Sequence, residues 1–120
     1  SRLGSKTLRE KISARAAIVT AAIDNRLDSI LDVVSIAVNC RNYYVHGADA
    51  KIEYDKYYFE TVPFLTDTLE FVFAASDLIE AGWDIEKYCQ RGTTMSHPFG
   101  SYLVSYKENQ QRLMELRPKA

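Results

Sequence analysis

The sequence has few of the residues that stabilise a small protein by means other than a packed core. It has two cysteines, Cys40 and Cys89, and no cysteine pair at the CxxC spacing of zinc sites. Two cysteines make no disulfide framework, so we interpret both as reduced, packed thiols of a cytosolic protein. Only 5 glycines and 3 prolines occur in 120 residues, and this composition favours helix.

Long apolar runs and a strong net charge are also absent. No apolar run approaches the roughly 20 residues that span a bilayer, and no signal-peptide pattern opens the chain. We therefore expect a cytoplasmic protein with no membrane partner. The formal net charge is −1, so any site for nucleic acid must be a local basic patch.

The length allows one domain with a single core. The first residues, "SRLGS", lack an initiating methionine and resemble a domain cut from a longer chain, or a cloning remnant. We expect residues 1–6 to be a linker or such a remnant, residues 7–117 to form a helical domain, and residues 118–120 to be a tail.

Helical signals divide the chain. "TLRE" at Thr7–Glu10 is a capping box, and it predicts a first helix that ends near residue 24. Asp28 is a plausible N-cap for a second helix, which Gly47 ends. A third helix is clearest from Pro63, interpreted as a first-turn proline.

The third helix is predicted to end at Gly82. A short helix over 83–90, a loop over 91–100 and an amphipathic last helix complete the pattern. The expected fold is all-α: an antiparallel bundle of four main helices with one short extra helix.

The second predicted helix is apolar almost all the way round, through "SILDVVSIAVNC". Such a helix is buried on most sides, and we expect it to be the central one. The second and third helices together carry more apolar surface than this core can cover, which favours a homodimer. The alternative is that chain outside this sequence covers that surface.

The segment "RNYYVHG", residues 41–47, carries the candidate chemistry. One interpretation is structural, because basic residues and a following glycine suit any helix end. The functional one takes Arg41 and His46 as catalytic, with Asn42, four residues before His46, orienting the imidazole. Arg91 and His97 have a spacing similar to that of Arg41 and His46, but they lie in a segment without helical pattern.

Arg41 and His46 suit the cleavage of RNA. An imidazole can take a proton from a 2′-hydroxyl or give one to the leaving oxygen, and a guanidinium can stabilise charge on phosphorus. No paired carboxylates stand beside the histidine, so we predict no metal and no cofactor.

An apolar helix that ends in Arg-Asn-x-x-x-His-Gly, in an all-helical domain of this size, resembles the HEPN superfamily and most closely its Apea-like branch. The residues that carry the resemblance are Arg41, Asn42 and His46. The resemblance implies a metal-independent endoribonuclease, acting as a dimer with the two motifs facing each other and leaving a 2′,3′-cyclic phosphate. It also implies a bacterial defence or toxin setting and an N-terminal sensor domain outside this sequence.

Three weaker RNA-binding candidates follow the motif: Tyr44 by stacking on a base, and Lys51 and Lys56 by contacting phosphates. Each residue type is more often a packed or solvated side chain. Two other hypotheses remain. One is a catalytically silent helical module for RNA binding or dimerisation, and the other is a ligand-binding bundle with the Phe-rich third helix as a pocket wall.

Overall fold

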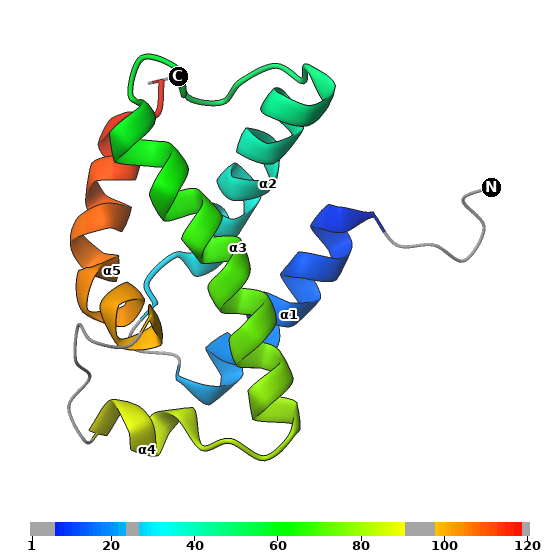
Figure 1. Ribbon diagram of the computed structural model, residues 1–120, viewed down its shortest axis with the longest axis vertical. Coiled ribbons are helices and arrows are strands. Elements are labelled where there is room, and N and C mark those ends of the chain that lie inside the picture. Colours follow the sequence, from blue (N-terminus) through cyan, green and yellow to red (C-terminus); the bar gives the residue numbers. More distant parts are fainter. Residues whose placement is uncertain (1–6, 24–26, 91–97, 119–120) are drawn as a thin grey trace.

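The computed structural model describes residues 7–23, 27–90 and 98–118, and only the backbone of 89, 90 and 98. The regular elements in these ranges are the helices α1 (Leu8–Ala22), α2 (Ile30–His46), α3 (Tyr58–Glu80), α4 (Ile85–Gln90) and α5 (Pro98–Glu115). The four long helices run alternately down and up the molecule, and α4 lies across one end (Figure 1). The predicted all-α antiparallel bundle, four main helices and a short one, is confirmed.

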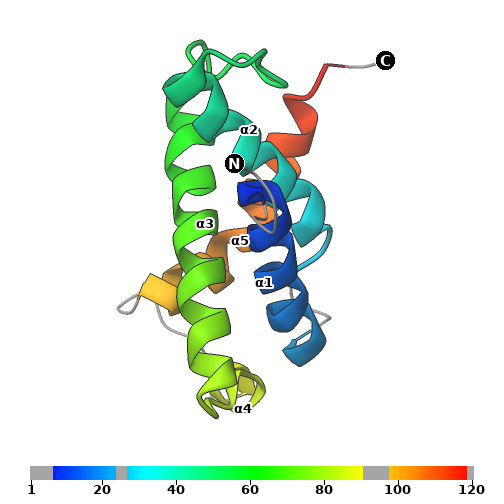
Figure 2. The same cartoon turned by 90° about the vertical axis from the view of Figure 1, so that its right-hand side faces the viewer.

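The helix at the centre is α3. It packs against α1, α2 and α5, whereas α2 packs chiefly against α1 and α3. Figures 1 and 2 show α3 running the length of the molecule, and Figure 1 shows α5 on one side of it and α1 and α2 on the other. The expectation that the second helix would be central is wrong, because α3 and not α2 packs against three of the other helices.

Two helix ends follow their sequence signals. At the start of α1 the Thr7 hydroxyl accepts from the Glu10 amide at 3.2 Å, and the Glu10 carboxylate accepts from the Thr7 amide at 2.9 Å. Gly47 ends α2 with φ +71°, a left-handed conformation that glycine adopts without strain. The amides of Gly47 and Ala48 donate to the carbonyls of Tyr43 and Asn42.

Other helix starts differ from the expectation. The N-cap of α2 is Ser29, not Asp28, and the Asp28 carbonyl instead accepts from the Tyr106 hydroxyl at 2.5 Å. α3 begins at Tyr58, so Pro63 lies inside it. Proline is only enriched at helix starts and does not require one. Pro63 has no backbone N–H to donate within α3, and it lies on the exposed side of that helix.

α5 also begins earlier than predicted, at Pro98, inside the segment expected to be a loop. Proline suits the first position of a helix because that amide has no intrahelical partner. None of the helices in the described ranges is long and apolar enough to cross a bilayer.

Candidate active site at the end of α2

The last turns of α2 present Arg41, Asn42 and His46. Arg41 is exposed, and its Nη1 donates to Asn42 Oδ1 at 3.4 Å. His46 is the last residue of α2 and is exposed. Among the described residues the Asn42 side chain is therefore hydrogen-bonded to Arg41 and not to His46, and the orientation of the imidazole by Asn42 stays a prediction. The other spaced pair, Arg91 and His97, lies outside the described residues.

Helical geometry separates the two catalytic candidates around α2. Each residue turns the helix by about 100°, so Asn42 and His46, four apart, share a face. Arg41 and His46, five apart, lie on different faces of the same end. A single chain therefore brings Arg41 and His46 to one end of α2 but does not pair them.

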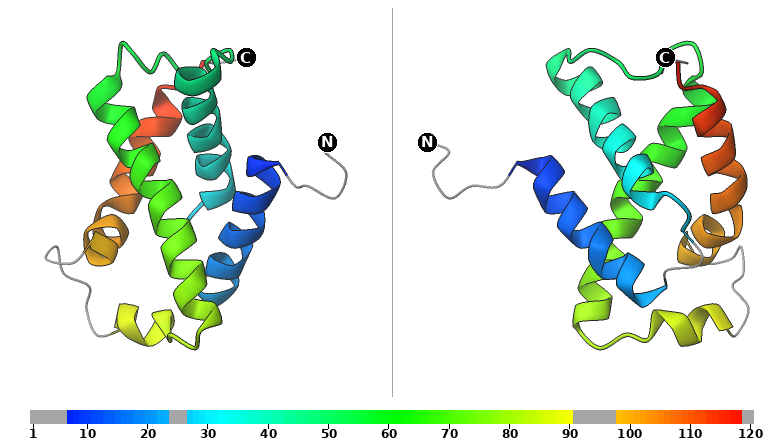
Figure 3. Two further views of the ribbon diagram at one scale, coloured as in Figure 1. Left: turned by 45° about the vertical axis from the view of Figure 1, so that its right-hand side comes forward. Right: turned by 180° about the vertical axis from the view of Figure 1, so that it is seen from behind.

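Arg41 lies at an apolar groove between α2 and α3. These helices diverge toward the end where residues 47–57 join them (Figures 1 and 3). The groove has a volume of about 370 Å³. We call it the Arg41 groove; it is lined by Ala37, Cys40, Arg41, Tyr44, Val45, Val62, Leu65, Thr66, Leu69 and Glu70. The groove thus places the candidate arginine beside the exposed side chains of Tyr44 and Val45.

The α3 wall of the groove continues beyond the groove itself. Phe59 and Phe73 are spaced from Val62 and Leu69 so that helical periodicity places all four along one side of α3. Phe59 is 87% exposed and Phe73 38%. Exposed aromatic residues in line with an apolar groove are typical of a surface that contacts another protein.

The three weaker RNA-binding candidates have different positions. The Tyr44 ring is partly exposed, but its hydroxyl donates to Asp55 Oδ1 at 2.7 Å. Lys56 lies over the Tyr57 ring, with its Nζ 5.2 Å from the ring centroid. Lys51 Nζ donates to Ser35 Oγ at 3.2 Å. Only Tyr44 lines the Arg41 groove.

Asp55 holds two neighbouring tyrosines of α2. Tyr43 donates to Asp55 Oδ2 at 2.6 Å, and Tyr44 donates to the other oxygen. These two hydrogen bonds lower the pKa of the Asp55 carboxyl below its ordinary value. Sequence reasoning missed Asp55, since nothing in the spacing of "KIEYDKYY" indicates that its aspartate reaches back to α2.

Asn39 is the second residue that sequence reasoning missed. Its Nδ2 donates to the Asp49 carbonyl at 2.8 Å, and its Oδ1 accepts from the Lys51 amide at 2.8 Å and the Tyr54 hydroxyl at 2.6 Å. Asn39 thereby holds the segment after Gly47 against α2. A signal existed, because an asparagine in the apolar run "SIAVNC" needs hydrogen-bond partners when buried.

Cys40 borders the Arg41 groove, and its side chain is buried and reduced. Burial, with the nearby Asp55 charge, raises the pKa of the Cys40 thiol to about 11. The packed, reduced state predicted for Cys40 is confirmed. The side chain of Cys89 lies outside the described residues, and within them no three His, Cys, Asp or Glu side chains gather as a metal site requires.

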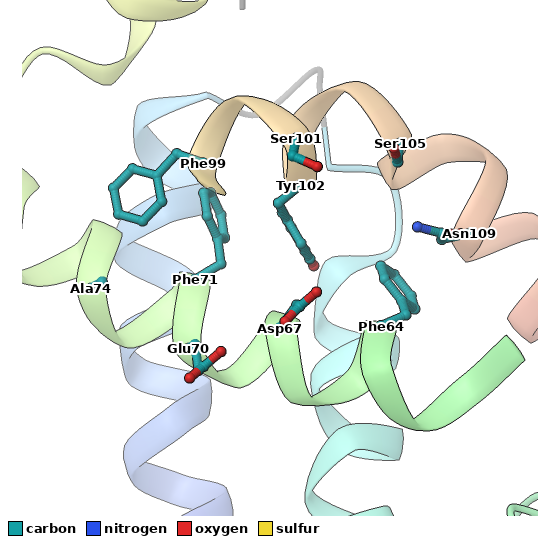
Figure 4. A pocket seen from close by; sticks show the side chains of 10 residues that line it. All are labelled: Phe64, Asp67, Glu70, Phe71, Ala74, Phe99, Ser101, Tyr102, Ser105 and Asn109. Carbon is teal, nitrogen blue, oxygen red and sulfur yellow. The ribbon is translucent and has the colours of Figure 1, made fainter. Parts of the chain in front are cut away.

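A second pocket, of about 300 Å³, lies between α3 and α5. The rings of Phe71, Tyr102 and Phe64 follow one another along it, and the carboxylate of Asp67 lies below the tip of the Tyr102 side chain in the view of Figure 4. Ring centroids of Phe71 and Tyr102 are 4.5 Å apart and nearly parallel. The described residues that line this pocket include no basic side chain, and none of them belongs to the motif of α2.

Comparison with known proteins bears on the family. The family model described as Apea-like HEPN matches residues 1–87, a range that contains Arg41, Asn42 and His46. No curated protein matches the chain, and no solved structure matches it. Because the match covers well over half of the chain and the fold is an all-α bundle, the chain belongs to the Apea-like HEPN family.

Proposed function

We propose that this chain is a metal-independent endoribonuclease that acts as a homodimer, with Arg41 and His46 as its catalytic residues. The observation that carries the proposal is the position of Arg41 on the wall of an apolar groove at the end of α2. Family membership adds support, because the match includes the motif.

A second copy of the chain is the occupant that fits the Arg41 groove. In a twofold contact the same surface serves both partners, so the groove of each chain meets the groove of the other and the two Arg41 side chains come close together. That arrangement builds a basic site on a chain of net charge −1.

The chemistry needs no co-reactant besides RNA. The imidazole of one His46 takes the proton of a 2′-hydroxyl, and that oxygen forms a bond to the adjacent phosphorus. The bond from phosphorus to the 5′-oxygen breaks, and the other His46, protonated, gives its proton to the leaving oxygen. Arg41 stabilises the charge on phosphorus. The products are a 2′,3′-cyclic phosphate and a 5′-hydroxyl.

The wider setting belongs to the same proposal. Residues 7–117 form the catalytic domain, a separate N-terminal domain senses a trigger, and the nuclease works in the cytoplasm in bacterial defence or as a toxin. The alternative within this family is a silent module that binds RNA or dimerises without cutting.

Cleavage of RNA in EDTA by wild type, His46→Ala and Arg41→Ala tests the proposal. We expect both variants to lose at least a hundredfold in rate while their far-UV circular dichroism stays unchanged, and the wild-type product to end in a 2′,3′-cyclic phosphate. His97→Ala is the matched control and should cleave normally. Equal rates for His46→Ala and wild type, or no cleavage by either, would favour the silent module.

A further inference from the structure

Two cations from different parts of the chain meet at one hydroxyl of α2. Arg9, on the first turn of α1, donates through Nη1 to Ser35 Oγ at 2.6 Å. Lys51, in the segment after α2, donates through Nζ to the same oxygen at 3.2 Å. The two nitrogens therefore lie within about 5.8 Å of each other, the largest separation that two such contacts to one atom allow.

Among the described residues, no carboxylate lies within the 4.0 Å of an ion pair from Arg9 or Lys51. Within the described ranges neither Arg9 nor Lys51 takes part in an ion pair, and the ion pairs there join Arg15 to Asp77 and Glu80. Like charges held this close repel each other. An anion placed between them would relieve that repulsion and would accept hydrogen bonds from both side chains.

The backbone of Lys51 is fixed before any ligand arrives. Its backbone amide is bound by Asn39 Oδ1 at 2.8 Å, and Asn39 is one turn from Ser35 on α2. The Ser35 oxygen already accepts from both cations, so its own hydrogen is available to a third acceptor. Arg9, Lys51 and Ser35 thus present three kinds of donor at one point.

This point lies on the same face of α2 as His46. Ser35, Asn39, Asn42 and His46 follow one another at helical spacing. At 1.5 Å per residue, Ser35 is about 16 Å along the helix from His46. A nucleic-acid strand that reaches both points must extend a few nucleotides beyond the one at His46.

We propose that Arg9, Lys51 and Ser35 bind a backbone phosphate of the RNA, a few nucleotides from the phosphate that is cleaved. This inference rests on RNA being the substrate proposed above. The subsite contributes affinity and register rather than catalysis, because phosphate contacts position a strand without reading its bases. It makes longer RNA a better substrate than a dinucleotide.

Binding of a single-stranded RNA ten-mer to the His46→Ala protein, as a function of salt, tests the subsite without cleavage. Arg9→Ala and Lys51→Ala should each weaken binding about tenfold. Each should also make the fall of log affinity with log salt less steep by about 0.7, the value for one phosphate contact to a single strand. Arg9→Lys should retain part of the affinity. Lys107→Ala, an exposed lysine of α5, is the control and should change neither quantity.

Cleavage by proteins with His46 intact separates the subsite from the active site. Arg9→Ala should lower kcat/KM for the ten-mer about tenfold and leave it unchanged for a dinucleotide. The subsite is overturned if Arg9→Ala and Lys51→Ala bind the ten-mer as tightly as Lys107→Ala does. It is also overturned if Arg9→Ala lowers kcat/KM equally for the dinucleotide and the ten-mer, or if the protein binds no RNA at low salt. Full cleavage by His46→Ala would instead overturn the proposed function, while the binding comparison still tests the subsite.

Discussion

The hydroxyl of Tyr54 donates to Asn39 Oδ1 at 2.6 Å, and both side chains are buried. The same oxygen accepts from the Lys51 amide, and Asn39 Nδ2 donates to the Asp49 carbonyl. Three residues of the segment after Gly47, Asp49, Lys51 and Tyr54, are therefore hydrogen-bonded to the middle of α2. The backbone of Lys51 therefore depends on this one asparagine, and Asp55, which follows Tyr54, is held where it accepts from the hydroxyls of Tyr43 and Tyr44.

Asn39→Ala should lower the free energy of unfolding by about 2–3 kcal/mol, because it leaves buried polar groups without partners. Tyr54→Phe removes one of the three hydrogen bonds of Asn39 and the longer one from the same hydroxyl to the Ile36 carbonyl, and should cost about 1 kcal/mol. Urea denaturation of both variants checks that Asn39→Ala loses more stability than Tyr54→Phe. Equal stabilities of Asn39→Ala and wild type would show that Asn39 does not hold the segment.

Asp55→Asn should reduce stability at neutral pH and less so in acid. The two tyrosine hydroxyls lower the pKa of Asp55 in the folded protein, so the unfolded chain binds its proton more readily. The stability that the charged Asp55 contributes is complete above the pKa that Asp55 has in the unfolded chain. It is lost as the pH falls through the lower pKa that Asp55 has in the folded protein.

Urea denaturation of wild type and Asp55→Asn at pH 7 and near pH 3 measures this difference. The gap in free energy of unfolding should narrow at the acidic pH. A gap that stays constant or widens in acid would mean that the two tyrosines do not favour the charged carboxylate.

Cys40 should react slowly with thiol reagents. At pH 8 its thiol, with a pKa of about 11, is almost wholly protonated, and the thiolate is the reactive form. In a Cys89→Ala background the single remaining thiol can be followed by the release of thionitrobenzoate, which should be slow in buffer and fast in urea. Rapid reaction in buffer would contradict the burial of Cys40.

Gly47→Ala should lower the free energy of unfolding by about 1 kcal/mol, because alanine is strained at φ +71°. Apart from the neighbours of Gly47 along the chain, no atom of the described residues lies within 4 Å of the added methyl group, so we attribute the effect to backbone conformation. Gly47→Asn should cost less, since asparagine tolerates the left-handed region better. Thermal unfolding ranks the two variants, and the reverse order would contradict this account of the helix end.

Sequence alone predicted those features that depend on neighbours along the chain. The capping box at Thr7, the end of α2 at Gly47 and the apolar periodicity of the long helices are local, and they are confirmed. Pro63 and Pro98 misled the prediction because proline is compatible with both a helix start and a loop. Only packing decides which of these forms.

The unpredicted parts of the site connect residues distant in sequence. Asp55 reaches Tyr43 and Tyr44, Asn39 reaches Tyr54, and Arg9 meets Lys51 at Ser35. No periodicity relates such positions, since the fold itself brings them together. The motif residues could be named from the sequence, whereas the Arg41 groove beside them could not.

Molecular mass and cleavage rate, measured together for Val45→Asp, test the central claim that one groove serves both dimerisation and catalysis. Val45 lines the Arg41 groove and is 59% exposed. Val104, on α5 and outside the groove, is 52% exposed, so Val104→Asp is the matched control.

Sedimentation at micromolar protein should show Val45→Asp as a monomer that cleaves RNA at least tenfold more slowly than wild type, while Val104→Asp stays dimeric and active. The account is contradicted if Val45→Asp keeps the wild-type mass and rate, or if Val104→Asp loses both equally.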